Sequence, residues 1–456
     1  LVSNTSEQPP PQPALPEEER QKREADKRKA RKNNGAKRDM HYEMEEEEHV
    51  VYPDDPDFDI NKARLFTTVP RICVRYECIP MRFIKHVYKI HTYTQEGRLF
   101  EGKTPASAFL NSSYDGSFIA GLMELRYIQS LPVERIINYF ESHGFTLKKP
   151  TAHKLMEKAS SLFENLYKCI RQTALSDPYK AADETYYKIL VPEKNSKGKG
   201  VRKGYLWVVV GINTRMIYLL YDDGSRSERV ILNELGSCKG IIQSDGYSPY
   251  RKLESDAYPN ITRIPCLQHI KRKFIDCGEK DPDAKRIVEL INALYQNEHK
   301  HKVGVEGWTV EQNLMHRKKY APDILGEIKD VLDEIEERGD LLPKSELQEA
   351  ITYLRNEWNA VVDIFNYGDT YLDNNMVERM NRYISLSRKN SLFFGSHKGA
   401  ERGAILYTIA LTCRMHKVNL FEYLTDVINR TAEWQPNTPI EKYRELLPDR
   451  WEKAND

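Results

Sequence analysis

The sequence predicts a mixed α/β fold, and two observations support that prediction. Three apolar segments follow one another at residues 180–191, 205–210 and 216–221. The polar links between them are short, so the three segments are expected to pair as an antiparallel meander. Short apolar runs then alternate with segments of helical periodicity, which is the pattern of strand–helix–strand units. A sheet that is part antiparallel and part parallel accounts for both observations.

The elements after the meander set the order of this sheet. A helix is expected at residues 226–235, followed by a buried strand at 240–244 and a short helix near Pro249. Another strand ends at Cys266, and a further helix begins near Gln268. The order β-β-β-α-β-α-β-α is that of a ribonuclease H-like fold, in which the first and fourth strands are adjacent and parallel.

Helical segments flank this predicted core. Residues 280–345 are charged and carry no strand signal, which predicts a helical insertion. Before the core, one helix is expected at residues 118–128, a second from Pro132 to Gly144, and a third at 151–173. The second and third helices, with lysines at their turn, suit a helix-turn-helix. Plain packing of three helices stays open as the alternative.

The N-terminal region is dominated by charge. Residues 20–38 carry ten basic and two acidic residues, a net of +8, whereas residues 43–59 carry nine acidic residues and no Lys or Arg. Such segments bury too little apolar surface to order, so a disordered arm is expected. The basic block either holds phosphates non-specifically or pairs with its acidic neighbour. Residue 1 is Leu, so we expect the natural chain to begin upstream.

The bulk composition excludes some classes of protein. The 456 residues include 69 Lys and Arg against 68 Asp and Glu, a net of +1, so a nucleic-acid surface has to be local. No apolar run approaches the roughly 18 to 20 residues of a membrane span. With no secretory pattern at the start, we expect no membrane partner and a cytoplasmic location. The seven scattered cysteines suit reduced thiols.

Three acidic residues fall where the strand order would bring them together. Asp183 lies in the first strand and Asp245 where the fourth strand ends, so the two would stand about 4.8 Å apart. Carboxylates that close repel each other unless cations lie between them. Asn374 and Asn375 are expected to start a helix that carries Glu378 on one face. Each acid also has a plain interpretation, as a solvent-facing strand residue, a strand-ending turn or a salt-bridged helix start.

The three carboxylates would form an all-oxygen metal site. Mg²⁺ prefers such oxygen ligands and takes water and substrate phosphate as its remaining ligands. Mn²⁺ is an alternative. Two ions about 3.5 to 4 Å apart can activate an attacking oxygen and stabilise the leaving one in phosphoryl transfer. Arg379 and Arg382, close to Glu378, would hold the phosphates.

These motifs resemble the transposases of the insertion-sequence-66 family, over about residues 105–451. The catalytic acids of that family lie in Ala-Asp-Glu-Thr, as at 182–185, in Gln-x-Asp-Gly-Tyr-x-x-Tyr, as at 243–250, and in Asp-Asn-Asn-x-x-Glu-Arg, as at 373–379. Further matches are Cys266-x-x-His269-x-x-Arg272-Lys273-Phe274, Arg388-Lys389-Asn390-x-Leu392-Phe393, Gly395-Ser396 with Gly399-Ala400-Glu401-Arg402, and Leu446-Leu447-Pro448-x-x-Trp451.

The resemblance implies a DDE-type transposase with a ribonuclease H-like core, which cuts and joins insertion-sequence ends with bound Mg²⁺. Asp183, Asp245 and Glu378 would then be the catalytic residues and the metal ligands. The implied partners are double-stranded DNA, as terminal inverted repeats and target DNA, and further copies of the chain, with room for accessory proteins. A bacterial, nucleoid-associated location would follow. The alternatives are a catalytically impaired, transposase-derived DNA-binding protein and a nuclease-like fold with another substrate.

Basic residues near the strand ends and helix starts are the predicted DNA contacts. His269 would bind a phosphate or orient Asp245, or else cap its own helix, and a solvated helix face is the alternative for residues 271–273. The predicted contacts are Lys148, Lys149, Lys271, Arg272, Lys273, Arg379, Arg382, Arg388, Lys389 and Arg402.

One departure from the family pattern concerns zinc. The family has an N-terminal module with paired Cys-x-x-Cys, whereas this chain has Cys73-x4-Cys78 and His86-x4-His91. The gap between these pairs is shorter than the roughly 12 residues of a Cys2His2 finger, so zinc is not expected there. Recognition of DNA ends would then rest on the helices before the core and on the basic arm.

These expectations divide the chain into seven parts. They are a charged arm (1–60), a small β-rich, degenerate zinc-finger-like module (61–104), a helical DNA-binding domain (105–178), the catalytic core (179–278), the helical insertion (279–345), the C-terminal part of the core with the Glu-bearing helix (346–430), and a tail (431–456).

Overall fold

The structure is a computed structural model, and the fold below is that of the compact unit Pro80–Asp456. The described residues are 81–87, 92–95, 98–101, 108–109, 112–194, 198, 200–278, 281–432, 434–435 and 437–453. The predicted charged arm lies outside them. So do Cys73, Cys78 and His91 of the two Cys and His pairs.

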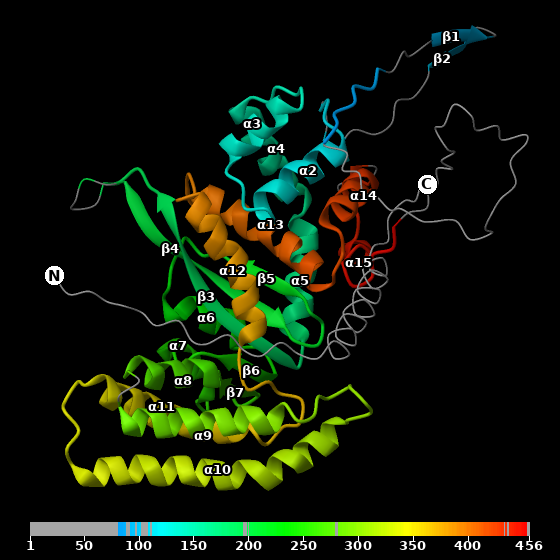
Figure 1. The fold of residues 1–456 in the computed structure, drawn as a ribbon. Coiled ribbons are helices and arrows are strands. Elements are labelled where there is room, and N and C mark those ends of the chain that lie inside the picture. The colour runs from blue at the N-terminus through cyan, green and yellow to red at the C-terminus, as the bar shows by residue number, and fades with distance from the viewer. Residues whose placement is uncertain are drawn as a thin grey trace, which may run out of the picture. The chain divides into compact units, whose positions relative to one another are not determined.

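A five-stranded mixed sheet forms the centre of this unit (Figure 1). Its strands stand in the order β5-β4-β3-β6-β7, with β3, β4 and β5 antiparallel and β3, β6 and β7 parallel. The predicted meander and the parallel pairing of the first and fourth strands are therefore confirmed. The strands are β3 (Tyr179–Leu190), β4 (Val201–Gly211), β5 (Ile217–Leu220), β6 (Gly240–Ser244) and β7 (Ile261–Pro265).

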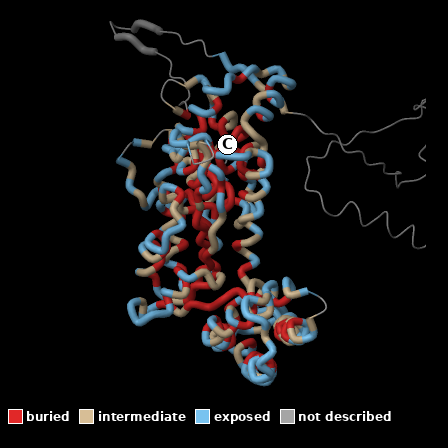
Figure 2. The backbone as a smooth tube through the Cα atoms, turned by 90° about the vertical axis from the view of Figure 1, so that its left-hand side faces the viewer, coloured by how far each residue is buried: buried red, intermediate tan, exposed pale blue. Residues whose placement is uncertain are grey.

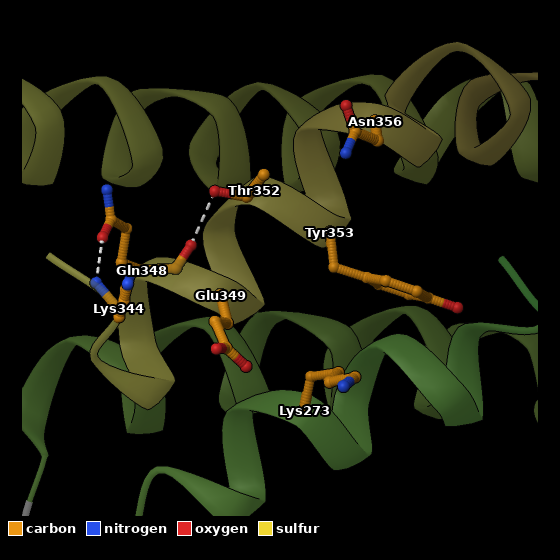
Figure 3. A pocket seen from close by; sticks show the side chains of 7 residues that line it. All are labelled: Lys273, Lys344, Gln348, Glu349, Thr352, Tyr353 and Asn356. Carbon is orange, nitrogen blue, oxygen red and sulfur yellow. Dashed lines mark hydrogen bonds between the residues drawn. The ribbon is translucent and has the colours of Figure 1, made fainter. Parts of the chain in front are cut away.

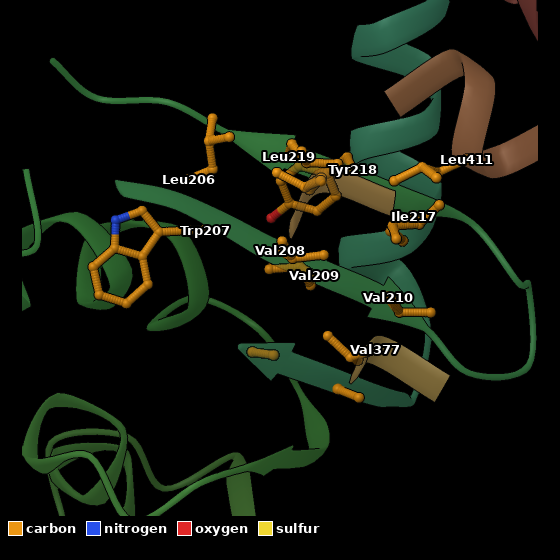
Figure 4. Close-up of a cluster of buried hydrophobic side chains, with 14 of the residues drawn as sticks. Leu206, Trp207, Val208, Val209, Val210, Ile217, Tyr218, Leu219, Val377 and Leu411 are labelled. Carbon is orange, nitrogen blue, oxygen red and sulfur yellow. The ribbon is translucent and has the colours of Figure 1, made fainter. Parts of the chain in front are cut away.

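The core lies on both faces of the sheet, as strand β4 shows. All five residues from Leu206 to Val210 are at most 1% exposed, so their side chains are covered on either side. That explains why this run is continuously apolar instead of alternating. Helix α12 (Asn375–Asn390) contacts β3 and β4, and α13 (His397–Met415) contacts β5. Their side chains Val377 and Leu411 are drawn with the strand residues in Figure 4, and Figure 2 shows the buried positions along the chain.

The helices before the sheet differ in detail from the prediction. Helix α2 (Gly116–Tyr127) matches, and α3 (Val133–Ser142) follows Pro132, which is its N-cap. The predicted third helix is two helices, α4 (Lys149–Leu162) and α5 (Glu164–Ser176), that meet at Phe163.

The break has a local cause and a tertiary one. The hydroxyls of Ser160 and Ser161 both donate to the Glu157 carbonyl, an interaction that bends helices. Phe163 is fully buried, and the change of direction lets α5 pack on β4 and β5 while α4 packs on α2 and α13.

The predicted insertion consists of helices joined by loops and contains no strand among its described residues. Helix α9 (Pro282–Glu298) packs on α10 (Val310–Arg338), and both lie with α11 (Glu346–Ile364) in the lower part of Figure 1. Arg317 of α10 is fully buried; it binds the Glu298 carboxylate and donates to the carbonyls of Tyr367 and Thr370. This arginine therefore fixes the chain that leads into α12.

The remaining elements complete the unit. No helix among the described residues is long and apolar enough to cross a membrane. The elements not yet named are β1 (Thr92–Gln95), β2 (Arg98–Glu101), α6 (Glu228–Leu235), α7 (Ser248–Arg251), the 3-10 turn η1 (Lys252–Glu254), α8 (Leu267–Asp276), α14 (Leu420–Ala432) and α15 (Ile440–Arg444).

A pair of glycine substitutions tests the backbone conformation at the start of β6. Gly240 has φ +93°, and a Cβ placed there would lie 2.2 Å from the Pro178 carbonyl oxygen, so Gly240→Ala should destabilise by about 2 kcal/mol or more. Gly326 lies inside α10 with open space around it, so Gly326→Ala should stabilise by about 0.5 to 1 kcal/mol. Thermal unfolding of both variants measures the difference. Equal melting temperatures would contradict the β6 backbone described above.

Candidate active site

Three elements converge at the site: the middle of β3, the end of β6 and the start of α12. Asn374 donates from Nδ2 to the Ala182 carbonyl (3.1 Å), and Gln243 donates from Nε2 to the Tyr371 carbonyl (2.8 Å). These bonds join segments about 130 to 190 residues apart in the chain. The start of α12 is therefore held against β3 and β6 by buried amides.

The start of α12 differs from the sequence prediction in one respect. The helix begins at Asn375, as predicted, but the Asn374 side chain makes no capping bond. Instead, the Asp373 carboxylate accepts from the Asn375 amide (3.1 Å). Asn374 is thereby free to bind β3, so its side chain docks the helix rather than capping it.

The strand register bears on the positions of Asp183 and Asp245. Ala181 of β3 pairs with Gln243 of β6 in the parallel ladder. Asp183 and Asp245 each lie two residues beyond this last pair of the ladder, and the charge of Asp245 acts on the Asp183 carboxyl group. The register is therefore consistent with the prediction that the two residues are neighbours, which stays a prediction.

Asp183 is a strongly perturbed carboxyl group. Burial, and then the nearby charges of Glu184 and Asp245, raise its pKa to about 8. Its oxygens accept from the Glu184 amide (2.8 Å) and from Asn381 Nδ2 (2.7 Å). Neither Asp183 nor Asp245 has a basic side chain within 4 Å among the described residues. Two adjacent carboxylates thus lack a cationic partner.

Glu184, the neighbour of Asp183 in β3, is buried and paired, although a glutamate in a strand would also suit a solvent-facing position. Its side chain is 5% exposed and forms an ion pair with Arg226. Tyr250 donates its hydroxyl to the other carboxylate oxygen (3.3 Å), and the Arg226 guanidinium lies 4.1 Å from the Tyr247 ring centroid. Arg226 therefore compensates the third carboxylate of this region, and leaves Asp183 and Asp245 uncompensated.

Asp245 is positioned through its backbone. Its carbonyl accepts from the buried guanidinium of Arg263 (2.7 Å), which also binds Glu357 of α11. The Asp245 carboxylate accepts from the Tyr247 amide (3.0 Å). The turn after β6 is thus tied to β7 and α11, so the position of Asp245 does not depend on the turn alone.

Glu378 lies in the first turn of α12, three residues before Asn381. That spacing puts both side chains on one face of the helix, about 5 to 6 Å apart at Cβ, and Asn381 is the residue that binds Asp183. Glu378 Oε1 is buried and has no hydrogen-bond partner. The carboxylate lies 3.9 Å from His269 Nε2 and 4.0 Å from the Arg272 guanidinium. The helix N-terminus favours a negative charge here.

The predicted DNA contacts divide into two groups. Lys149 pairs with Glu134 and Arg402 with Glu157, while Arg388 donates to Tyr186 and covers its ring at 3.9 Å. These three residues make contacts within the protein. Among the described residues, the rest form no ion pair apart from the contact of Arg272 with Glu378; they are Lys148, Lys271, Lys273, Arg379, Arg382 and Lys389.

An open groove adjoins the turn after β6, between α8 and α11 (Figure 3). It encloses about 340 Å³, and Lys273 and Tyr353 both line it. The Tyr353 hydroxyl accepts from the Gly246 amide (2.8 Å), so the wall of the groove is joined to the turn that carries Asp245. Lys273 is therefore the predicted DNA contact that the groove presents.

Sequence reasoning missed three residues that support this site: Asn381, Arg226 and Arg263. Asn381 had a signal, because it follows Glu378 by one helical turn. Arg263 also had one, since it is an arginine inside a short buried strand. Arg226 had none, because its partner Glu184 lies 42 residues away in sequence.

Three uncharacterized proteins of Sinorhizobium fredii (strain NBRC 101917 / NGR234) are similar to the chain. They are y4jD (25% identical over 370 residues, 78% of this chain and 70% of the relative), y4hP (24% over 438 residues, 91% and 76%) and y4qI (25% over 384 residues, 80% and 69%).

A protein-family model described as the transposase IS66 family matches residues 111–402. The match contains all three predicted acids and the helices and strands that position them. It covers more than half of the 456 residues. The chain therefore belongs to the transposase IS66 family, as its motifs predicted.

Proposed function

We propose that this protein is an active DNA transposase that cleaves and joins the ends of an insertion sequence by divalent-metal catalysis. Membership of the family implies a role in DNA transposition, with DNA as the partner. The observation that supports catalysis is that the charge of Asp245 raises the pKa of the buried Asp183 carboxyl group, while neither acid forms an ion pair among the described residues. The sheet order is consistent with a ribonuclease H-like core, which we infer on that basis.

The residues of the site fit hard divalent cations. Burial and the charge of Asp245 both disfavour ionised Asp183, and a bound cation would offset both effects. Glu378 Oε1 and Asn381 Oδ1 are buried oxygens without a hydrogen-bond donor. Carboxylate and amide oxygens are ligands that Mg²⁺ and Mn²⁺ accept. We therefore propose that Asp183, Asp245 and Glu378 hold these ions.

In this mechanism the chain supplies position and charge. Two bound ions would activate the attacking oxygen and stabilise the leaving one. Asn381 orients the Asp183 carboxylate, and Arg263 fixes the backbone of Asp245. Glu378 stands at a helix N-terminus, which stabilises its negative charge, and the Arg272 guanidinium lies 4.0 Å from its carboxylate. These contacts hold the acids in place before DNA arrives, so little reorganisation is needed at the reacting phosphate.

DNA is proposed to lie along the exposed basic residues that make no structural ion pair. Arg379 and Arg382 extend from the helix that carries Glu378, and Lys273 lines the groove beside the turn of Asp245. Lys148, the exposed N-cap of α4, fits the proposed recognition of DNA ends by the helices before the core. A homo-oligomer that brings two ends together is part of the same proposal.

Substitution of the acids tests catalysis. Glu378→Gln keeps the shape of the side chain but removes its charge, and Asp245→Ala removes a ligand, so strand cleavage on a labelled element end with Mg²⁺ should fall by at least about 100-fold. EDTA should abolish cleavage by the wild type. Glu289→Gln, on the exposed face of α9, is the matched control and should cleave normally. DNA binding without cleavage by the wild type would favour the alternative, a transposase-derived binder.

The raised pKa of Asp183 predicts how pH affects stability. The ordinary pKa of an Asp carboxyl group is 3.8 and that of Asp183 in the fold is about 8, so the folded state binds the proton more tightly. The stability it contributes is present below about pH 4 and is lost as the pH rises towards 8, at no more than about 1.4 kcal/mol per pH unit. Without metal, wild type should therefore lose more stability between pH 5 and pH 8 than Asp183→Asn does.

Thermal unfolding at the two pH values measures this effect. Asp330→Asn, at an exposed position of α10, should show the wild-type pH dependence. Mg²⁺ should raise the melting temperature of the wild type at pH 8 and leave Asp183→Asn nearly unchanged. An identical pH dependence in all three proteins would show that Asp183 is not the perturbed group.

Two arginines of α12 test the proposed DNA surface. Arg379→Ala and Arg382→Ala should each weaken DNA binding several-fold at low salt, and lower the slope of log affinity against log salt by about 0.9. Arg286→Ala on α9, where Arg286 pairs with Glu334, is the control and should leave both quantities unchanged. Fluorescence anisotropy with an element end, in the absence of divalent ions, measures them. Unchanged salt slopes in the two α12 variants would remove these arginines from the surface.

A further inference from the structure

A second group of potential metal ligands stands next to the proposed catalytic acids. Cys266, His269 and Glu378 place a sulfur, an imidazole nitrogen and a carboxylate oxygen all within 4.8 Å of one another. Cys266 is the N-cap of α8 and His269 follows three residues later, so both face the same side of the helix. Glu378 reaches them from α12.

The backbone holds these two helix starts together. Leu267 of α8 donates from its amide to the Leu372 carbonyl (2.9 Å), and the Asn374 amide donates to Cys266 Sγ (3.2 Å). Cys266 is 1% exposed. The spacing of the three ligand atoms is therefore set by buried contacts and not by mobile surface side chains.

Two of the ligand-bearing side chains have buried atoms without partners. His269 Nδ1 and Glu378 Oε1 are inaccessible to solvent and make no hydrogen bond. His269 Nε2 is 3.9 Å from Glu378 Oε1, which is too long for a hydrogen bond. Unpaired buried polar atoms cost free energy, so their presence in one cluster indicates a ligand that would satisfy them. His269 also does not cap α8, which removes its plain structural interpretation.

The chemistry of the three groups selects the ion. Thiolate and imidazole are ligands of Zn²⁺ and similar thiophilic ions, whereas Mg²⁺ takes oxygen. Burial raises the pKa of the Cys266 thiol to about 12, and the amides of Asn374, His269 and Gln268 act in the opposite direction. Binding would therefore release the thiol proton to solvent as the metal–sulfur bond forms, with the amide groups left to stabilise the thiolate.

We propose that Cys266, His269 and Glu378 bind a thiophilic divalent cation, with Zn²⁺ as the type, at a site that shares Glu378 with the catalytic acids. Three protein ligands leave one position of a tetrahedral ion for water. The sequence analysis considered zinc at the N-terminal Cys and His pairs and did not consider this set. A further consequence rests on the proposed function: Zn²⁺ engages Glu378 and so competes with Mg²⁺-dependent cleavage.

Cobalt absorption tests the site directly. Co²⁺ replaces Zn²⁺ and shows a thiolate-to-metal absorption band, so the full-length, metal-stripped protein should gain this band and lose it when Zn²⁺ is added. Cys266→Ser should abolish the band, and His269→Asn should weaken Co²⁺ binding at least about 10-fold. The matched control is Cys277→Ser at the other end of α8, which should retain the band.

The N-terminal cysteines need a separate control. The same titration of a Cys73→Ser/Cys78→Ser double variant shows whether the signal comes from those residues, and the band should persist there. Thermal unfolding of each variant without metal checks that it is folded. An unchanged cobalt band in folded Cys266→Ser would overturn the proposal.

Cleavage assays separate this site from the proposed function. Zn²⁺ should inhibit Mg²⁺-dependent cleavage by wild type and Cys277→Ser, and the concentration giving half inhibition should rise at least about 10-fold for Cys266→Ser, relative to its own uninhibited rate. A cobalt band in a protein that never cleaves DNA would refute the catalytic proposal and leave the site intact. Cleavage without any band would refute the site alone. Zn²⁺ bound without inhibition would show that Glu378 is not shared.

Discussion

The parallel pairing of β3 with β6 is the constraint on which the candidate site depends. Ala181 pairs with Gln243, and Asp183 and Asp245 each follow two residues later, where the charge of Asp245 disfavours ionised Asp183. Such a pair costs free energy in the absence of cations, so the surrounding fold has to hold it. The stability of the protein does not require this repulsive pair of carboxylates. Its presence is therefore more informative about function than a favourable contact would be.

Buried arginines and amides provide the rigidity that this repulsion requires. Arg263 joins the turn of Asp245 to β7 and α11, and Arg317 joins α10 to the chain that leads into α12. Asn374 and Asn381 then dock α12 on β3. The helical insertion is therefore part of the support of the site, because its α10 fixes the segment before Glu378.

The same geometry separates two kinds of basic residue that look alike in sequence. Arg388 follows Arg382 in the same helix, yet its guanidinium covers the Tyr186 ring and donates to β3, whereas Arg382 is exposed without an ion pair among the described residues. Glu378 lies beside Cys266 and His269, and Asn381, one helical turn after it, contacts Asp183. Glu378 is the ligand that the two proposed metal sites share, one with oxygen ligands and one with sulfur and nitrogen ligands. An ion bound at either proposed site would therefore act directly on the other site.

The sequence by itself determined the order of strands and helices, the position of the three acids and the family. Those features are local, because strand and helix periodicity and short motifs are written in consecutive residues. The tertiary structure decided the break at Phe163, the pairing of Glu184 with Arg226 and the division of the basic residues. The pairing and the division depend on contacts between side chains far apart in the chain, and the break, besides its local cause, depends on how α4 and α5 pack. Periodicity carries no information about such contacts, which form when the elements pack.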